Sequence, residues 1–318
     1  MTRIICDISA YQFWGSNHRI ASVGSRARLS SARGDAGASL SNEGFVRACN
    51  EYGITLPIHL QIADASESRH SEYFDYTCCS QLPPRSLVRV SADTYVVSPE
   101  LCFVEMARHI SLEQAVMLGY EICGIYILSD EERAPRKQPL IPLEMLQSYL
   151  ESASGLYGVR NARRAVRYVV EGSASPKETQ VIILLCLPKM YGVFGLPFPQ
   201  MNAKVEFGER AKRLSGKSHY SLDLYWPQAG LAVEYESDLH HTASHRIALD
   251  SQRRDVLTTM LPTYISITKE QLYDVLKFQK IAKVIAGHLK HRLRIDDPAF
   301  LERHMRLRAQ LFGHEQMR

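Results

Sequence analysis

Three carboxylates lie within one predicted hairpin, at Asp223, Glu234 and Glu236. The segment SLDLYWPQAGLAVEYES has two short apolar runs joined by Pro-Gln-Ala-Gly, which predicts two antiparallel strands and a tight turn. Glu234 and Glu236 are two residues apart, so they share one face of their strand, and we expect Asp223 to lie opposite them. Buried charges are costly unless compensated, and Mg²⁺ prefers oxygen ligands. The cluster therefore predicts a Mg²⁺ (or Mn²⁺) site.

Residues suited to proton transfer and phosphate binding surround the hairpin. His240 and His241 follow it directly, and histidine titrates near neutral pH. A predicted helix over residues 244–261 then carries Arg246, Arg253 and Arg254, and Lys217 precedes the hairpin; such cations suit phosphate oxygens. Glu178 stands early in another predicted helix, which opens with Ser175 and Pro176.

Each pattern also has a purely structural interpretation. The three carboxylates are equally what the solvent-facing side of a two-sided strand would carry. Glu178 would be favourable at a helix N-terminus without further chemistry, and SQRRD would suit a solvated helix face. His241 and His245 have the i, i+4 spacing of some zinc sites, but no cysteine is near and HExxH is absent. The choice between His240 and His241 as the acting histidine stays open.

The order of these residues resembles the PD-(D/E)XK nuclease superfamily. There an Asp ends one strand, a Glu-x-Lys or a variant lies on the next, and a preceding helix often contributes a Glu. The corresponding residues are Asp223, Glu234-Tyr235-Glu236 and Glu178. The finer similarity is to the branch related to very-short-patch repair endonucleases, where DF…P…LVIEVDG…H…R…D..RD..L recurs. This chain reads DLYWPQAGLAVEYESDLHHTASHRIALDSQRRDVL, and the resemblance covers about residues 173–290.

The resemblance implies a metal-dependent endonuclease that cleaves or nicks DNA by attack of a metal-activated water, in bacterial defence or a toxin–antitoxin context. RNA is the alternative substrate. Implied catalytic residues are Asp223, Glu234, Glu236, His240, His241 and Glu178; implied metal ligands are Asp223, Glu234 and Glu236; implied DNA contacts are Arg246, Arg253, Arg254 and Lys217. Glu236 replaces the lysine of the motif, although the related branch also carries an acid there and a downstream histidine. A non-catalytic, antitoxin-like nucleic-acid-binding regulator that retains the fold is the alternative function.

The elements that must position these residues predict an α/β chain with two domains. Its 318 residues, of which 45% are hydrophobic, suffice for two cores. We expect an α+β N-terminal domain at residues 1–135, whose role as sensor, recognition unit or dimer interface is open. A helical connector at 136–172, a nuclease-like domain at 173–292 and a helical tail at 293–318 follow. The C-terminal half predicts a restriction-endonuclease-like mixed sheet flanked by helices, and residues 98–124 are similar to the segment before such domains in AbiEi-type antitoxin proteins.

Local patterns predict the individual elements. Strand-like runs occur at residues 3–9 and 56–62, a hairpin at 86–99, and helices beginning at Ser98 and Ser111. Further helices are expected at 142–153, 161–172, 269–289 and 297–312, and strands at 203–207, 221–226, 231–237 and 263–268.

Charge and cysteine content bound the setting. The net charge of +4 permits a polyanionic partner such as DNA without demanding one, and a homodimer is compatible with the sequence. Seven cysteines without CxxC spacing favour reduced thiols in a cytoplasmic protein. The longest apolar run, VIILLCLP, is too short for a membrane span.

Overall fold

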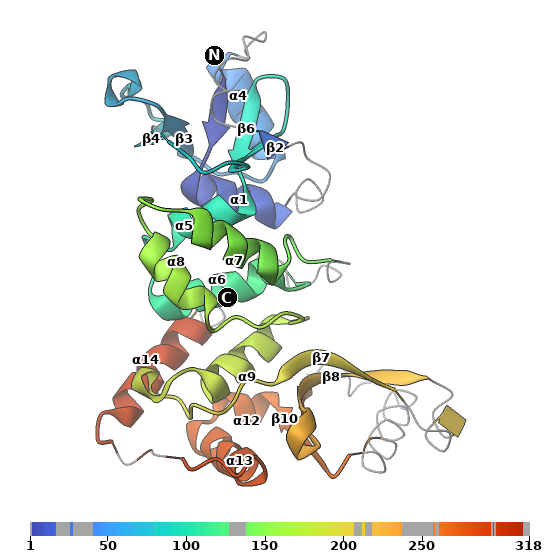
Figure 1. Cartoon of the computed structure of the whole chain (residues 1–318). Helices are drawn as coiled ribbons and strands as arrows, with labels where there is room; N and C mark the ends of the chain where they lie inside the picture. The colour runs from blue at the N-terminus through green and yellow to red at the C-terminus, as the bar shows by residue number, and fades with distance from the viewer. Residues whose placement is uncertain are drawn as a thin grey trace. The chain divides into compact units, whose positions relative to one another are not determined.

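The chain folds into two compact units, Met1–Val169 and Val170–Arg318, each with its own mixed sheet flanked by helices (Figure 1). The structure is a computed structural model. It describes residues 2–16, 26–27, 41–79, 81–126, 138–206, 212–213, 218–236, 257, 261–293, 295 and 297–313. The predicted α/β class is therefore confirmed at the level of two mixed sheets with helices.

The first unit contains a six-stranded sheet in the order β2-β5-β6-β1-β3-β4. Its strands are β1 (Arg3–Ile5), β2 (Arg26–Ala27), β3 (Ile58–Ile62), β4 (Phe74–Cys78), β5 (Leu87–Arg89) and β6 (Thr94–Val97). Pairs β1–β6 and β3–β4 are parallel, whereas β1–β3, β2–β5 and β5–β6 are antiparallel. Its helices are α1 (Asp7–Ser16), α4 (Asn42–Glu51), α5 (Pro99–Met106), α6 (Leu112–Cys123), α7 (Leu143–Ser152) and α8 (Val159–Val166).

Capping residues in the sequence correctly placed several of these helices. Ser98 accepts the backbone N–H of Leu101 at 3.3 Å and Ser111 accepts that of Gln114 at 3.2 Å, which satisfies donors left free by the first turn. The predicted hairpin is also confirmed, as β5 and β6. The strand expected at 3–9 is shorter, because the chain turns at Asp7 (φ 54°) and continues as α1.

Helices α7 and α8 pack with α5 and α6 inside the first unit rather than forming a separate connector. Asn161 of α8 donates to the carbonyl oxygens of Ala107 (2.8 Å) and Ile110 (3.2 Å), the turn that ends α5. Gly158 (φ 96°) precedes α8, and a Cβ there would meet the Val104 carbonyl oxygen at 2.2 Å. The division of the chain thus falls at Val169, after α8, because these helices complete the core of the first unit.

The second unit contains the four-stranded sheet β10-β9-β8-β7. Its strands are β7 (Gln200–Glu206), β8 (His219–Trp226), β9 (Leu231–Glu236) and β10 (Thr263–Thr268), with β7–β8 and β8–β9 antiparallel and β9–β10 parallel. Its described helices are α9 (Pro176–Cys186), α12 (Lys269–Tyr273), α13 (Val275–His288) and α14 (Phe300–Phe312). The single helix expected at 269–289 is two helices, since Asp274 has extended backbone and its side chain caps Lys277 N–H at 2.9 Å.

The expected C-terminal tail is an integral part of the second unit. Helix α14 buries Leu307 and Leu311, and Gln180 of α9 donates to the Leu311 carbonyl oxygen at 3.1 Å. The helix expected at 244–261 lies largely outside the described residues. Within the described ranges, no helix has the length and apolar character that crossing a membrane requires.

A buried carboxylate network closes the end of β1 in the first unit. The backbone N–H of Asp7 donates to Glu105 Oε2 at 2.7 Å, and the Asp7 carboxylate pairs with Arg108 and with His109 (3.1 Å). Burial raises the pKa of Glu105 to about 7, although the Asp7 N–H and the Arg108 charge oppose the shift. Folding therefore favours the protonated form of Glu105, which is about half populated near pH 7.

We predict that Glu105→Gln removes a pH-dependent loss of stability. The folded pKa is raised above its ordinary value of 4.5, so the stability due to the protonated form is complete below pH 4.5 and is lost as pH rises through 7. The variant should match the wild type near pH 5 and exceed it above pH 8 by about 1–3 kcal/mol in unfolding free energy. Urea unfolding followed by circular dichroism measures this. Glu144→Gln, on exposed α7 surface, is the matched control, and equal pH profiles for the two variants would contradict the assignment.

Candidate functional site

The sheet of the second unit opens between β8 and β9 at the predicted acidic residues. The two strands pair at Trp226↔Leu231, Tyr225↔Ala232 and Leu224↔Val233. Beyond this point β8 stays paired with β7 as far as His219, and β9 stays paired with β10 as far as Glu236. In the opening, Asp223 Oδ2 accepts the backbone N–H of Tyr235 at 2.9 Å. We call this opening, formed by Asp223, Glu234 and Tyr235, the fork.

The register aligns polar residues across the sheet at the fork. The β8–β9 ladder ends at Leu224↔Val233, and Asp223 and Glu234 are the next residues of the two strands at this point. Asn202 on β7 falls between the pairs Met201↔Leu224 and Ala203↔Leu222, which sets it opposite Asp223. Neighbouring positions Leu222, Leu224 and Val233 are fully buried and alternate with the polar row. We call Asn202, Asp223 and Glu234, the polar residues at this level of the three strands, the row.

Helix α9 brings a further carboxylate, Glu178, to this row. The helix packs on β8 and β9, and Glu178 is 7% exposed. Its Oε2 accepts the Ala174 N–H at 2.9 Å and the Asn202 side-chain N–H at 2.5 Å, while Ser175 Oγ donates to Oε1 at 3.0 Å. Glu178 thus stabilises the helix N-terminus, as its structural interpretation predicts, and also contacts the row across the sheet.

The charge state of Glu178 reflects its surroundings. Burial raises its pKa to about 8, and the nearby negative charge of Asp223 acts in the same direction. Hydrogen bonds from Ala174, Ser175 and Asn202 favour the ionised form and reduce the shift. Glu178 consequently holds a proton at pH 7, which limits the repulsion among the acids of the row.

The two predicted acids of β9 occupy different environments. Glu234 is 6% exposed, and the hydroxyl of Tyr264 on β10 donates to its Oε2 at 3.5 Å. Glu236 is half-buried at the end of β9, beside Thr268 of β10. The fork therefore holds Glu234 in the interior and Glu236 nearer to solvent.

Asn202 is a site residue that the sequence analysis missed. It has φ 45°, which is uncommon outside glycine but several-fold enriched for asparagine, and its amide also donates to the Gly172 carbonyl oxygen at 2.8 Å. The strand was expected to begin at residue 203, whereas it begins at Gln200. The sequence offered one signal for Asn202. It stands directly before the predicted strand, and asparagine is uncommon in strands, so its presence there could have indicated a special role.

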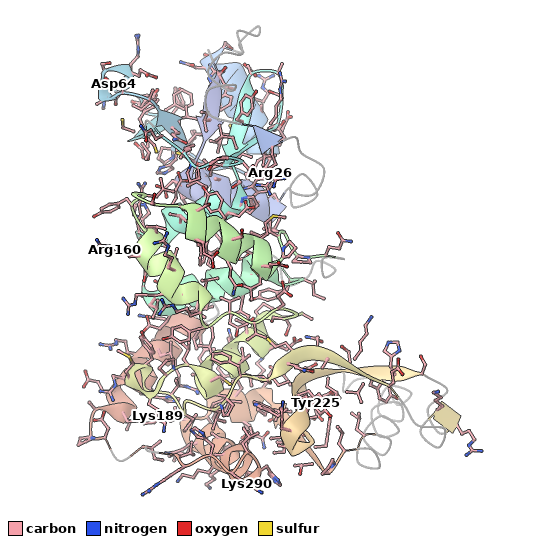
Figure 2. The ribbon with its side chains drawn as sticks, in the orientation of Figure 1. Arg26, Asp64, Arg160, Lys189, Tyr225 and Lys290 are labelled. Atoms are coloured by element: carbon pink, nitrogen blue, oxygen red, sulfur yellow. The ribbon has the colours of Figure 1, made fainter. Side chains whose placement is uncertain are left out.

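The remaining predicted site residues lie outside the described residues. They are His240, His241, Arg246, Arg253, Arg254 and Lys217, and their roles stay predictions. The aromatic pair of the hairpin is described: Tyr225 (labelled in Figure 2) is half-buried, and Trp226 is 3% exposed with its indole N–H donating to the Pro197 carbonyl oxygen at 2.8 Å. Trp226 therefore belongs to the core and is not available for stacking on a base.

Few side chains in the described part of the chain could bind a metal ion. No set of three or more His, Cys, Asp or Glu side chains there is close enough to hold a metal ion. Mg²⁺, however, is commonly held by one or two carboxylates together with waters and substrate phosphates. Asp223 and Glu234, which lie where β8 and β9 part, are the two carboxylates that could meet this smaller requirement.

The lysine nearest in sequence to Glu178 does not replace the missing lysine of the motif. Lys177 donates to the Tyr273 hydroxyl at 2.6 Å, and its ammonium lies 5.0 Å from the centre of the same ring. Its charge is therefore used to join α9 to α12.

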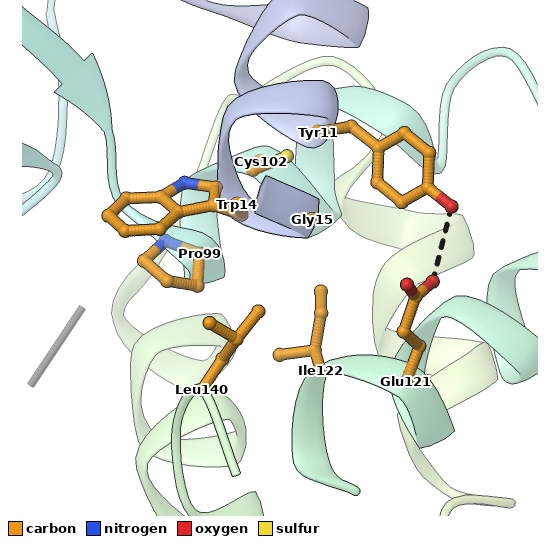
Figure 3. Close-up of a pocket in the computed structure, with 8 residues that line it drawn as sticks. All are labelled: Tyr11, Trp14, Gly15, Pro99, Cys102, Glu121, Ile122 and Leu140. Carbon is orange, nitrogen blue, oxygen red and sulfur yellow. Dashed lines mark hydrogen bonds between the residues drawn. The ribbon is translucent and has the colours of Figure 1, made fainter. Parts of the chain in front are cut away.

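A cavity in the first unit is too small to be an alternative ligand site. Tyr11, Trp14, Gly15, Pro99, Cys102, Glu121, Ile122 and Leu140 line it (Figure 3), and its volume is about 10 Å³. That is room for about one water, whereas small-molecule sites take several hundred Å³. The Tyr11 hydroxyl is bound to Glu121 at 3.2 Å, which closes one side.

We predict that Asp223→Asn lowers the pKa of Glu178 below 8 while leaving it above 4.5. The substitution removes the charge that raises the pKa but keeps burial, and asparagine Oδ1 can still accept the Tyr235 N–H. A ¹³C NMR titration of glutamate side chains measures it, with the Glu178 signal assigned by its loss in Glu178→Gln. Glu206→Gln, an exposed change on β7, should leave the titration unchanged. If the pKa of Glu178 is unchanged in Asp223→Asn, the charge of Asp223 does not act on Glu178, and the prediction is contradicted.

Comparisons of the chain with models of protein families, with curated proteins and with solved structures give no match. The functional assignment therefore depends on the geometry of the fork and its neighbours.

Proposed function

We propose that the second unit is a metal-dependent nuclease domain of the PD-(D/E)XK type, similar to the very-short-patch repair branch, that cleaves or nicks DNA. The observation that carries the proposal is the proximity of Glu178 on α9 to Asp223, whose charge helps to raise the pKa of Glu178, at the point where β8 and β9 part beside Glu234. The mixed sheet β10-β9-β8-β7 with α9 against it is compatible with a restriction-endonuclease-like fold.

Asp223 and Glu234 would hold a Mg²⁺ or Mn²⁺ ion in this proposal. When bound, such an ion lowers the pKa of a coordinated water and polarises a phosphate oxygen. Glu178 would lose its proton as the cation neutralises the row, and Asn202 would keep its carboxylate oriented through the 2.5 Å hydrogen bond. Glu236, nearer to solvent, would complete the ligand set or orient a water.

The residues beyond β9 would supply the rest of the reaction. His240 or His241 would take a proton from the attacking water or bind the scissile phosphate, since imidazole exchanges protons near neutral pH. Arg246, Arg253, Arg254 and Lys217 would bind phosphate oxygens without reading sequence. RNA is the alternative substrate for the same set of residues.

A non-catalytic nucleic-acid-binding regulator is the second candidate function, and one observation favours it. The motif lysine is replaced by Glu236, and Lys177 is bound to Tyr273 instead of reaching the fork. A domain that keeps the fold and the acids but lacks the lysine would bind DNA without cutting it. The activity test below separates the two functions.

We predict that Mg²⁺ binding at pH 7 releases up to one proton per chain. Glu178, with its pKa near 8, is protonated beforehand and ionises when a cation joins the row. Calorimetric titrations in buffers of different ionisation enthalpy measure the released proton. Glu178→Gln should bind Mg²⁺ with no such release, because glutamine carries no titrating proton. The same heat in every buffer for the wild type would contradict the predicted coupling.

We predict that Asp223→Asn and Glu234→Gln each abolish Mg²⁺-dependent plasmid nicking while the thermal unfolding curve stays cooperative. Loss of the acting histidine, tested as His240→Ala and His241→Ala, should reduce the rate by on the order of a hundredfold or more. Glu206→Gln makes the same change in charge on exposed β7 and should retain activity. A wild-type chain that binds DNA but never cuts it with Mg²⁺ or Mn²⁺ would establish the regulator instead.

A further inference from the structure

Helix α8 of the first unit carries an exposed row of arginines. Arg160, Arg164 and Arg167 are all exposed, and spacings of four and three residues place them on one side of the helix, which Arg167 extends in helical conformation. Figure 2 shows Arg160 on the outer side of α8. At 1.5 Å per residue the row spans roughly 10 Å along the axis. We call Arg160, Arg164 and Arg167 the arginine face.

The fold uses a further arginine of α8, Arg163, which lies outside this face. Arg163 donates to the carbonyl oxygens of Leu150 (2.8 Å), Glu151 (3.3 Å) and Ala153 (2.5 Å), and so satisfies the C-terminus of α7. The sequence of α8, VRNARRAV, contains no acidic residue. Within the described ranges Arg160 and Arg167 form no ion pair.

The residues around the arginine face favour a nucleic acid over a membrane surface as its partner. Insertion into a membrane surface requires a free apolar face beside the basic one, but Val159, Ala162, Ala165 and Val166 are buried in the unit. Tyr157, in the turn before α8, is 82% exposed. An exposed aromatic ring beside arginines suits nucleic acid, because bases stack on such rings while cations bind the phosphates.

We propose that the arginine face and Tyr157 bind the sugar-phosphate backbone and bases of a nucleic acid. Arginine side chains bind phosphate oxygens without reading sequence, so three of them along one side of a helix suit the backbone of a nucleic acid. The site belongs to the first unit and needs no metal; only the choice of DNA as the nucleic acid rests on the proposed nuclease function.

The test compares the full-length chain with Arg160→Gln/Arg164→Gln/Arg167→Gln. Glutamine keeps good helix propensity and removes three charges. Binding of labelled single-stranded and duplex DNA is followed by fluorescence anisotropy in EDTA, over a series of salt concentrations. We expect affinity to fall on the order of tenfold or more, and the slope of log K against log salt to flatten by about 2–3, from roughly 0.9 per phosphate contact. Tyr157→Ala should weaken single-stranded binding more than duplex binding.

Two control variants separate a local surface from net charge and from stability. Arg47→Gln/Arg69→Gln/Arg85→Gln removes three charges from other exposed arginines of the first unit and should change affinity little. Arg163→Gln should lower the melting temperature without changing the salt slope, because its guanidinium is used by α7.

Several outcomes would overturn the proposal. They are no DNA binding by the wild type, an equal loss of affinity in both triple variants, and polyglutamate binding as tight as that of DNA of the same charge. Such binding of polyglutamate would indicate that the arginine face binds an acidic protein. Binding is measured in EDTA and nicking in Mg²⁺, so the two proposals fail separately. Intact DNA binding without nicking would reject only the nuclease. Nicking together with an unchanged salt slope in the arginine triple variant would reject only this surface.

Discussion

The arrangement of the acids in the second unit depends on one hydrogen bond, which the backbone N–H of Tyr235 donates to the carboxylate of Asp223. Where β8 and β9 separate, backbone groups lose their ladder partners, and an unpaired buried N–H is costly. The Asp223 carboxylate replaces one such partner at 2.9 Å. The two strands can therefore diverge while β8 remains paired with β7 and β9 with β10. An apolar residue at position 223 would offer no acceptor, and the opening between the strands would lose its support.

Buried carboxyl groups occur in both units, but they are compensated differently. In the first unit the Asp7 carboxylate pairs with Arg108, so a cation of the chain itself balances the charge, and Glu105 nearby receives a backbone N–H. At the fork, Glu178 accepts from a backbone N–H, a hydroxyl and an amide, all of them neutral donors. Neutral donors reduce the cost of ionisation, but burial and, after it, the repulsion from Asp223 outweigh them, which is why a proton is retained. In the proposed function, a bound cation would supply at the fork the positive charge that Arg108 supplies in the first unit.

Local chemistry made part of this architecture predictable. Ser98, Ser111 and Ser175 marked helix starts in the sequence. Each serine side chain accepts a backbone N–H of the first turn, only three residues later, so this signal is local. The turn from Pro227 to Gly230 likewise marks the hairpin, and with it the register that brings Asp223 and Glu234 to the end of the β8–β9 ladder. The sequence did not reveal the turn at Asp7 or the place of Asn202. Both depend on partners far along the chain, Glu105 and Glu178 respectively, which no local pattern announces.

The acids of the fork also constrain where a nucleic acid would gain its affinity. Phosphates and carboxylates repel each other, so a row containing Asp223 and Glu234 opposes binding of DNA until a cation intervenes. Attraction must then come from basic residues elsewhere, and the chain supplies arginines on α8 and in the segment after β9. In the proposed function, binding strength would therefore be governed by salt through the arginines, whereas cleavage would be governed by the divalent ion through the acids. Such a chain would engage DNA by residues that do no chemistry, and it would react only where the local negative charge has been neutralised.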